Sequence, residues 1–288
     1  MMSGHPLQDV EGSSLSAKIA GKASRFLARN VRSKALVLRN AAPIVTFTFD
    51  DVPASACDTG ASILEKHDAR GTFYVAGRGC SQVGYDGLPL ASIDQLRTVW
   101  GNGHEIGCHT YSHPAVSRIS FDQLRVELER NRQVLKDIDE GIDVRNFAYP
   151  YGDLTFRTKH YLETRFDSCR SINLGINAGI ADLGSLKAWP LENASVDRAK
   201  IAELITRTIE SNGWLIFYSH DVGERPSKYG VSPDLLQWAV EAAKTNGCVL
   251  VTLASALRLI AGAPNWNDHS LSKRPTAEGS KANVRRAG

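Results

Sequence analysis

The sequence predicts an α/β protein whose strands form a parallel sheet, arranged either as an open sheet or as a (β/α) barrel. Short runs of β-branched and aromatic residues alternate with stretches of helical apolar spacing over residues 43–252. This alternation is typical of strand–helix–strand crossovers. The length of 288 residues fits one or two domains, and a single barrel is normal at this length. Hydrophobic residues make up 42% of the chain and charged residues 23%, which argues against extensive disorder and against fibrous classes.

The expected elements follow one another without an internal repeat. The first strand, Pro43–Phe49, alternates β-branched and aromatic residues, and the third, His104–Gly107, follows a Gly-Asn-Gly turn. The helix at 120–138 begins at Ser120 and continues with leucines at helical spacing, so that capping and periodicity agree. No GxGxxG motif follows the first strand, which argues against a dinucleotide-binding protein. Further strands are expected at Gly71–Gly77, Asn146–Tyr149, Phe166–Arg170, Trp214–Tyr218 and Cys248–Thr252, and further helices at about 58–67, 92–101, 155–163, 197–211 and 233–245.

Charge divides the chain into three regions. Residues 1–42 carry seven Lys/Arg and two Asp/Glu, and residues 269–288 carry five basic residues and one acidic residue. The remaining residues, 43–268, hold 22 basic and 28 acidic residues. We therefore expect a basic, helical N-terminal extension, a central domain at 43–268 and a disordered basic tail. An acidic central domain lacks the basic face that nucleic-acid binding requires.

The N-terminal extension has two interpretations. Residues 14–40 place apolar side chains near helical spacing among seven Lys/Arg. The favoured interpretation is a helix packed against the central domain, and the alternative is peripheral association with a membrane surface. No apolar run approaches the roughly 18 residues of a transmembrane segment, and no apolar core of a secretory signal is present. Five cysteines without CxxC spacing predict reduced thiols. These features together predict a cytoplasmic protein.

Four polar clusters follow predicted strands. Each cluster alone could be purely structural: a helix cap, a turn, a chance spacing of histidines or a structural histidine. They are Asp50 and Asp51 in TFTFDD, His109 and His113 in HTYSHP, Pro150 and Tyr151 in FAYPYG, and His220 in WLIFYSHD. In a (β/α) barrel the carboxyl ends of the strands meet at one face, where active sites form. One Asp with two His can bind a metal and leave positions open. A second carboxylate can then act as general base and a distant His as general acid. The clusters predict metal-assisted hydrolysis of an amide or ester.

Taken in order over residues 43–261, TFDD, HTYSH, FAYPYG and an apolar strand ending in His resemble the NodB-homology polysaccharide deacetylases, carbohydrate esterase family 4. The resemblance implies a distorted (β/α) barrel with fewer than eight repeats and about seven strands. It also implies hydrolysis of N-acetyl groups on an amino-sugar oligo- or polysaccharide. Its cofactor would be a divalent metal, zinc in the first place, with cobalt, nickel or manganese as other candidates.

The resemblance also implies a role for each matching residue. Asp50 would be the general base, and His220 would protonate the leaving amine. The metal ligands would be Asp51, His109 and His113, while the Tyr151 backbone N–H, which follows Pro150 in the turn, would bind the oxyanion.

Two departures from the family pattern bear on the substrate. Ala148 stands where the family has an arginine that pairs with the base, and Arg170, at the end of the fifth strand, is a candidate replacement for that charge. The fourth family motif has no clean match; Lys187–Asn193 is nearest, and its Trp189 is expected to line the substrate groove. Two alternatives therefore stay open. The same metal site could hydrolyse another C–N bond in a small amide, or the barrel could bind carbohydrate without catalysis.

Overall fold

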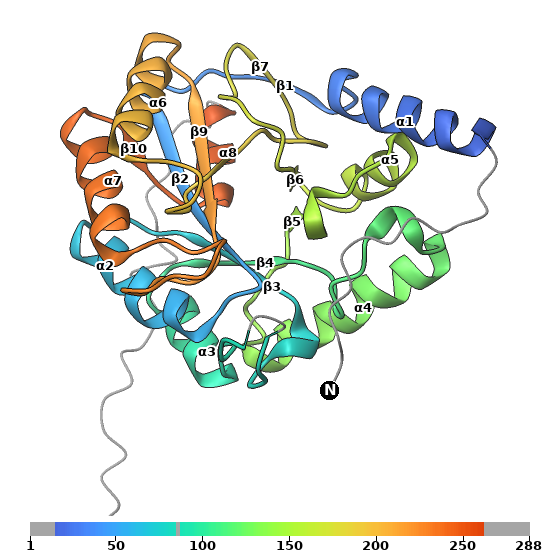
Figure 1. The fold of residues 1–288 in the computed structure, drawn as a ribbon, viewed down its shortest axis with the longest axis horizontal. Helices are drawn as coiled ribbons and strands as arrows, with labels where there is room; N and C mark the ends of the chain where they lie inside the picture. Colours follow the sequence, from blue (N-terminus) through green and yellow to red (C-terminus); the bar gives the residue numbers. More distant parts are fainter. Residues whose placement is uncertain (1–14, 85–86, 262–288) are drawn as a thin grey trace, which may run out of the picture.

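The computed structural model describes residues 15–84 and 87–261, which form a curled parallel sheet surrounded by helices (Figure 1). The eight-stranded sheet has the order β6-β5-β4-β3-β2-β9-β8, with β10 beside β2, and all of its pairs are parallel. Its strands are β2 (Ile44–Asp50), β3 (Thr72–Val75), β4 (Glu105–Cys108), β5 (Asn146–Ala148), β6 (Ser168–Arg170), β8 (Trp189–Pro190), β9 (Trp214–Ser219) and β10 (Val249–Leu250). A separate two-stranded sheet pairs β1 (Ala35–Val37) with β7 (Ile180–Asp182). The helices are α1 (Leu15–Asn30), α2 (Ala61–Lys66), α3 (Ile93–Gly101), α4 (Phe121–Ile138), α5 (Phe156–Glu163), α6 (Arg198–Glu210), α7 (Pro233–Thr245) and α8 (Leu253–Ile260).

The chain from Leu183 to Leu191, which includes edge strand β8, connects the β6 edge of the large sheet with β9. On the β6 side, the backbone N–H of Leu186 donates to Cys169 O at 2.9 Å. On the β9 side, the backbone N–H of Leu191 donates to Tyr218 O at 2.7 Å. The sheet therefore curls round on itself, and the predicted distorted (β/α) barrel is confirmed. Because every strand runs the same way, all their carboxyl ends open onto one face.

Alternation along β2 separates two environments. Phe47 and Phe49 belong to the large core between the sheet and the outer helices. The intervening Thr46 and Thr48 face the barrel interior, where Thr46 Oγ1 accepts a hydrogen bond from Trp214 Nε1 at 2.9 Å. Successive side chains of a strand point to opposite faces, so Asp50 continues the Thr46–Thr48 series. The sequence IVTFTFD thus carries a carboxylate into the mouth of the barrel.

The N-terminal extension differs from the expected helix over 14–40. Helix α1 ends at Asn30, and Ala35–Val37 instead pairs antiparallel with β7, with Val37 opposite Ile180. Strands β1, β7 and β8 and helix α8 were not predicted, because elements of two to eight residues show little periodicity of their own. Residues 1–14 and the predicted tail at 269–288 lie outside the described residues. Among the described helices, none is long and apolar enough to span a bilayer.

Candidate active site

Apart from Trp189, the predicted site residues lie at or beyond the carboxyl ends of strands, and several residues of these segments have unusual backbone angles. Asp51, Thr110, His113 and Tyr151 all have positive φ, between 55° and 62°. A non-glycine residue pays about 1–3 kcal/mol for a left-handed conformation, and such residues cluster where function requires them. Local sequence preference alone would not select these conformations, so the surrounding contacts must hold them.

Asp51, His109 and His113 bring three ligand atoms together. The two imidazole Nε2 atoms lie 3.1 Å apart. Asp51 Oδ1 lies 3.4 Å from Nε2 of His113 and 3.8 Å from Nε2 of His109. All three atoms fall within 4.8 Å of one another. One carboxylate and two imidazoles suit zinc and related divalent ions, and a set of three leaves coordination positions for water and substrate.

The two histidines are in the protonation state that a metal ligand needs. The Nδ1 of His109 lies 2.9 Å from Ala148 O, which can only accept, so Nδ1 carries the proton and Nε2 keeps its lone pair. Burial is the main cause that lowers the pKa of His109 to about 4, and it lowers the pKa of His113 to about 4 as well. Both imidazoles are therefore neutral at pH 7.

The turn that carries His113 is held by a residue that the sequence did not single out. The Glu127 carboxylate, on α4, accepts hydrogen bonds from the backbone N–H groups of Tyr111 at 3.0 Å and Ser112 at 2.7 Å. It also accepts the Ser112 hydroxyl at 2.8 Å. Thr110 Oγ1 accepts the His113 N–H at 3.1 Å. Glu127 looks like any other acidic residue of a helix surface, and only the fold brings it to this turn.

The proposed base, Asp50, is buried and ion-paired. Arg170 Nη2 contacts both of its carboxylate oxygens, Oδ1 at 2.5 Å. The arginine is itself fully buried, with its Cζ 5.4 Å from the ring centroid of Tyr74 and 5.1 Å from that of Tyr218. Burial by itself would raise the pKa of Asp50, but Arg170, His109 and neighbouring charge hold this pKa below its ordinary value. Asp50 is thus kept ionised inside the barrel.

The position of Arg170 accounts for the first departure from the family pattern. Ala148 and Arg170 are direct partners in the parallel pair of β5 and β6. Partners in a parallel pair present their side chains on the same face of the sheet. The positive charge therefore reaches Asp50 from the neighbouring strand, across the small side chain of Ala148.

His220 lines an open cavity of about 340 Å³ together with Asp51 and His113. Arg78 and Gln82 line the same cavity. Nδ1 of His220 lies 3.3 Å from Tyr229 O, so a backbone carbonyl, not a carboxylate, orients the ring.

The remaining predicted residues have more varied positions. Tyr151 is 60% exposed, and its ring meets the His113 ring with centroids 4.4 Å apart. Pro150 is buried in the turn before it. Trp189 does not line the cavity, contrary to expectation. It packs against the large core, with Lys200 Nζ 4.8 Å from its ring centroid, because its place in β8 directs it toward the outer helices.

A curled (β/α) barrel with a carboxylate–histidine–histidine group and a buried, ion-paired carboxylate at its mouth is suited to metal-assisted hydrolysis. Residues 39–164 match the family model for polysaccharide deacetylase. This match covers less than half of the chain, and over these residues the chain is similar to the NodB-homology polysaccharide deacetylases, carbohydrate esterase family 4.

Individual relatives show the same similarity. A chitin deacetylase from Colletotrichum lindemuthianum is 25% identical over 267 residues, covering 88% of this chain and 96% of that protein. A peptidoglycan-N-acetylglucosamine deacetylase from Bacillus cereus is 27% identical over 113 residues, covering 38% of this chain and only 37% of that protein. The solved structure of the Colletotrichum lindemuthianum chitin deacetylase matches 77% of this chain and 89% of that chain, with a TM-score of 0.54 and 19% identity. At that identity the last comparison bears on the fold alone.

Proposed function

We propose that the protein is a metal-dependent hydrolase that removes N-acetyl groups from an amino-sugar oligo- or polysaccharide. The observation that carries this proposal is the ionised, arginine-paired Asp50 directly beside the Asp51–His109–His113 group. The names of the chitin and peptidoglycan deacetylase relatives support the same class of substrate.

Zinc is the ion we propose for Asp51, His109 and His113, because neutral imidazoles and one carboxylate match its ligand preferences. Cobalt, nickel and manganese suit the same donors. When bound, such an ion makes water more acidic and polarises a carbonyl oxygen. The ion fits the residues present, since the Nε2 atoms of both histidines lie within 4 Å of Asp51 Oδ1 and the hydrogen bond of His109 Nδ1 leaves its Nε2 unprotonated.

The chain's own residues supply the proton transfers. Asp50 accepts a proton from the attacking water, and Arg170 keeps the carboxylate charged until that step. The Tyr151 backbone N–H donates to the oxygen that becomes negative. His220, oriented by Tyr229 O, gives a proton to the departing nitrogen as the C–N bond breaks. Water and amide thus become acetate and a free amine.

Asp50→Asn tests this assignment. Acetate release from N-acetylglucosamine oligomers should fall by about 10²–10⁴-fold, the usual contribution of a general base. Metal content should stay the same, because Asp50 is not one of the three ligands. Asp94→Asn, a highly exposed carboxylate on α3, is the matched control. Turnover by Asp50→Asn within tenfold of the wild type would contradict the assigned role.

The same assay separates the alternatives if small N-acyl compounds are included. Acetate release from small amides but not from sugar oligomers would identify the substrate as a small amide. Sugar binding by the wild type that is unchanged in Asp50→Asn, without turnover under any of the four metals, would favour a non-catalytic carbohydrate-binding barrel.

A further inference from the structure

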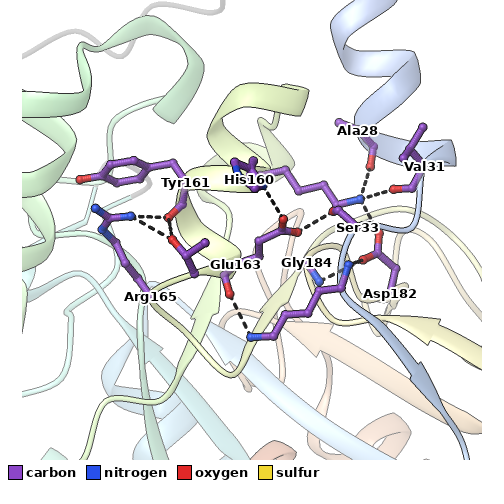
Figure 2. Close-up of polar contacts among 12 residues, drawn as sticks. Ala28, Val31, Ser33, His160, Tyr161, Glu163, Arg165, Asp182 and Gly184 are labelled. Carbon is purple, nitrogen blue, oxygen red and sulfur yellow. Dashed lines mark hydrogen bonds and ion pairs between the residues drawn. The ribbon is translucent and has the colours of Figure 1, made fainter.

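Helix α1 is fixed to the barrel by a buried lysine at its C-terminal end. Lys159 of α5 is fully buried, and its Nζ donates to the backbone oxygens of Ala28, at 3.1 Å, and Val31. The same ammonium group pairs with Asp182 of β7 (Figure 2). A cation at the last carbonyls of a helix satisfies groups that have no partner within the helix. The end of α1 is therefore tied to two separate elements of the fold.

Further contacts continue along both sides of this junction. Lys34 Nζ donates to the backbone oxygens of Glu163 at 2.9 Å and Phe166 at 2.7 Å. Ser33 Oγ donates to Glu163 Oε2 at 2.5 Å (Figure 2). Earlier in α1, Ser24 Oγ accepts a hydrogen bond from the backbone N–H of Phe156 at 3.1 Å. Helix α1 is thus a fixed part of the domain, and its outward face is a preformed surface.

That outward face combines exposed apolar and basic side chains. Phe26 is 66% exposed and Leu27 is 44% exposed, whereas Ala28 is fully buried. At 100° per residue, Phe26 lies about 160° from Ala28, and Lys22 and Arg29 lie about 40° and 60° from Phe26, both on the same side of it. Both basic residues are exposed. Within the described part of the chain, neither has an ion-pair partner.

The surrounding sequence has no acidic residue to neutralise this face. Between Gly12 and Phe49 the chain carries seven Lys/Arg and neither Asp nor Glu. A second copy of the same face would bring like charges together. Residues 269–288 are also basic, which makes them a poor electrostatic match for this surface. A cationic helix face with a protruding aromatic ring suits an anionic lipid surface, which takes the ring among the acyl chains and the charges among the headgroups.

We propose that the outward face of α1, centred on Phe26, docks the protein on a bilayer that contains anionic lipids. The two earlier interpretations of the extension are then compatible. One face of α1 packs on α5, and the opposite face meets the membrane. This proposal goes beyond the deacetylase function and does not depend on it.

Co-sedimentation of the full chain with vesicles tests the proposal. The wild type should bind vesicles of phosphatidylcholine with phosphatidylglycerol, bind phosphatidylcholine vesicles weakly, and lose binding as salt rises. Phe26→Ser should weaken binding to the anionic vesicles about tenfold. Arg29→Glu changes two units of charge and should weaken it about thirtyfold. Leu259→Ser on α8 and Lys66→Glu on α2, exposed residues away from this face, are the matched controls and should bind as the wild type does.

Three results would overturn the proposal. The first is equal or absent binding to both kinds of vesicle. The second is binding that Phe26→Ser leaves unchanged, which would indicate attraction to any polyanion. The third is a dimer that Phe26→Ser dissociates, which would assign the face to a second copy. Thermal unfolding checks that each variant is folded. Because neither this measurement nor vesicle binding depends on deacetylase activity, failure of the membrane proposal can be told apart from failure of the proposed function.

Discussion

Replacing Arg170 by methionine removes the positive charge beside Asp50 and keeps most of the side-chain volume. Removing one partner of a buried ion pair costs about 3–5 kcal/mol, because the other charge is left without compensation. Asp50 can escape part of this cost by taking up a proton. An unpaired, fully buried carboxyl has a pKa raised by up to about 3–5 units, which would leave it largely neutral at pH 7. The free energy of unfolding should therefore fall by about 3–4 kcal/mol at pH 7.

The pH dependence of this loss has a definite sign. In the variant, the folded-state pKa of Asp50 lies above its unfolded value of about 3.9. Stability is then lost as pH rises from about 4 to 7, whereas the wild-type carboxyl, with its lowered pKa, gains stability over acid pH. Urea denaturation of the metal-free protein at both pH values measures the difference. The gap between wild type and variant should be small at pH 4 and largest at pH 7.

Activity and a control complete the experiment. A protonated base cannot accept a proton, so kcat/KM should fall by about 10²–10⁴-fold. Arg145→Met breaks the exposed Arg145–Asp167 pair, which also joins the chain near β5 and β6, and should cost less than about 1 kcal/mol. The double variant Ala148→Arg/Arg170→Ala moves the positive charge from β6 to the paired position on β5, where the family pattern has its arginine. It should recover most of the lost activity. An Arg170→Met enzyme within threefold of wild-type kcat/KM would refute the reasoning.

Three further predictions concern the shell around the site and the core. Glu127→Gln should weaken metal binding about 10–100-fold in equilibrium dialysis, since it loosens the turn that carries His113. Glu129→Gln, at an exposed position of the same helix, should leave the metal affinity unchanged. Equal metal affinities of the two variants would disprove the role of Glu127 in holding this turn. Gly107→Ala places a methyl group 2.6 Å from Tyr74 ring carbons and should lower stability by about 1–3 kcal/mol in urea. Burial lowers the pKa of His104 to about 4, below the ordinary value for histidine. Protonation of His104 therefore favours the unfolded chain and should cost about 3 kcal/mol of stability between pH 6.5 and 4; His104→Gln should remove this share of the pH dependence and leave the shares of His109 and His113.

The parts of the site that follow from strand periodicity could be predicted from the sequence. The alternation of IVTFTF places Asp50 on the inner face of β2, and the spacing of His109 and His113 brings two imidazoles together after β4. A role for Arg170 could be stated only as a candidate. Its contact with Asp50 depends on the register of β5 against β6, which no local pattern encodes.

Other features depend on tertiary contacts and had no sequence signal. Glu127 acts through a turn 15 residues before it in the chain. Trp189 was expected in the groove, but two residues of β8 give no alternation from which its direction could be predicted. The pattern at 14–40 indicated one helix, yet the helix ends at Asn30. Beyond it, Lys159 binds the backbone oxygens at the helix end, and the chain then pairs with β7. In each case, long-range contacts that no local sequence pattern encodes decide the structure.

The contacts of Lys159 at the end of α1 show that the folded unit begins before the residues that the family model matches. The family match begins at residue 39, after the whole of α1 and β1. A protein trimmed to that boundary would keep Lys159 but lose Ala28 O and Val31 O, two of the acceptors around its buried ammonium group. It would also lose Ser33 and Lys34, which satisfy Glu163 and the end of α5. Shortening at residue 39 would therefore leave the buried ammonium group of Lys159 with Asp182 but without its two backbone acceptors, and residues 15–38 belong to the folded body.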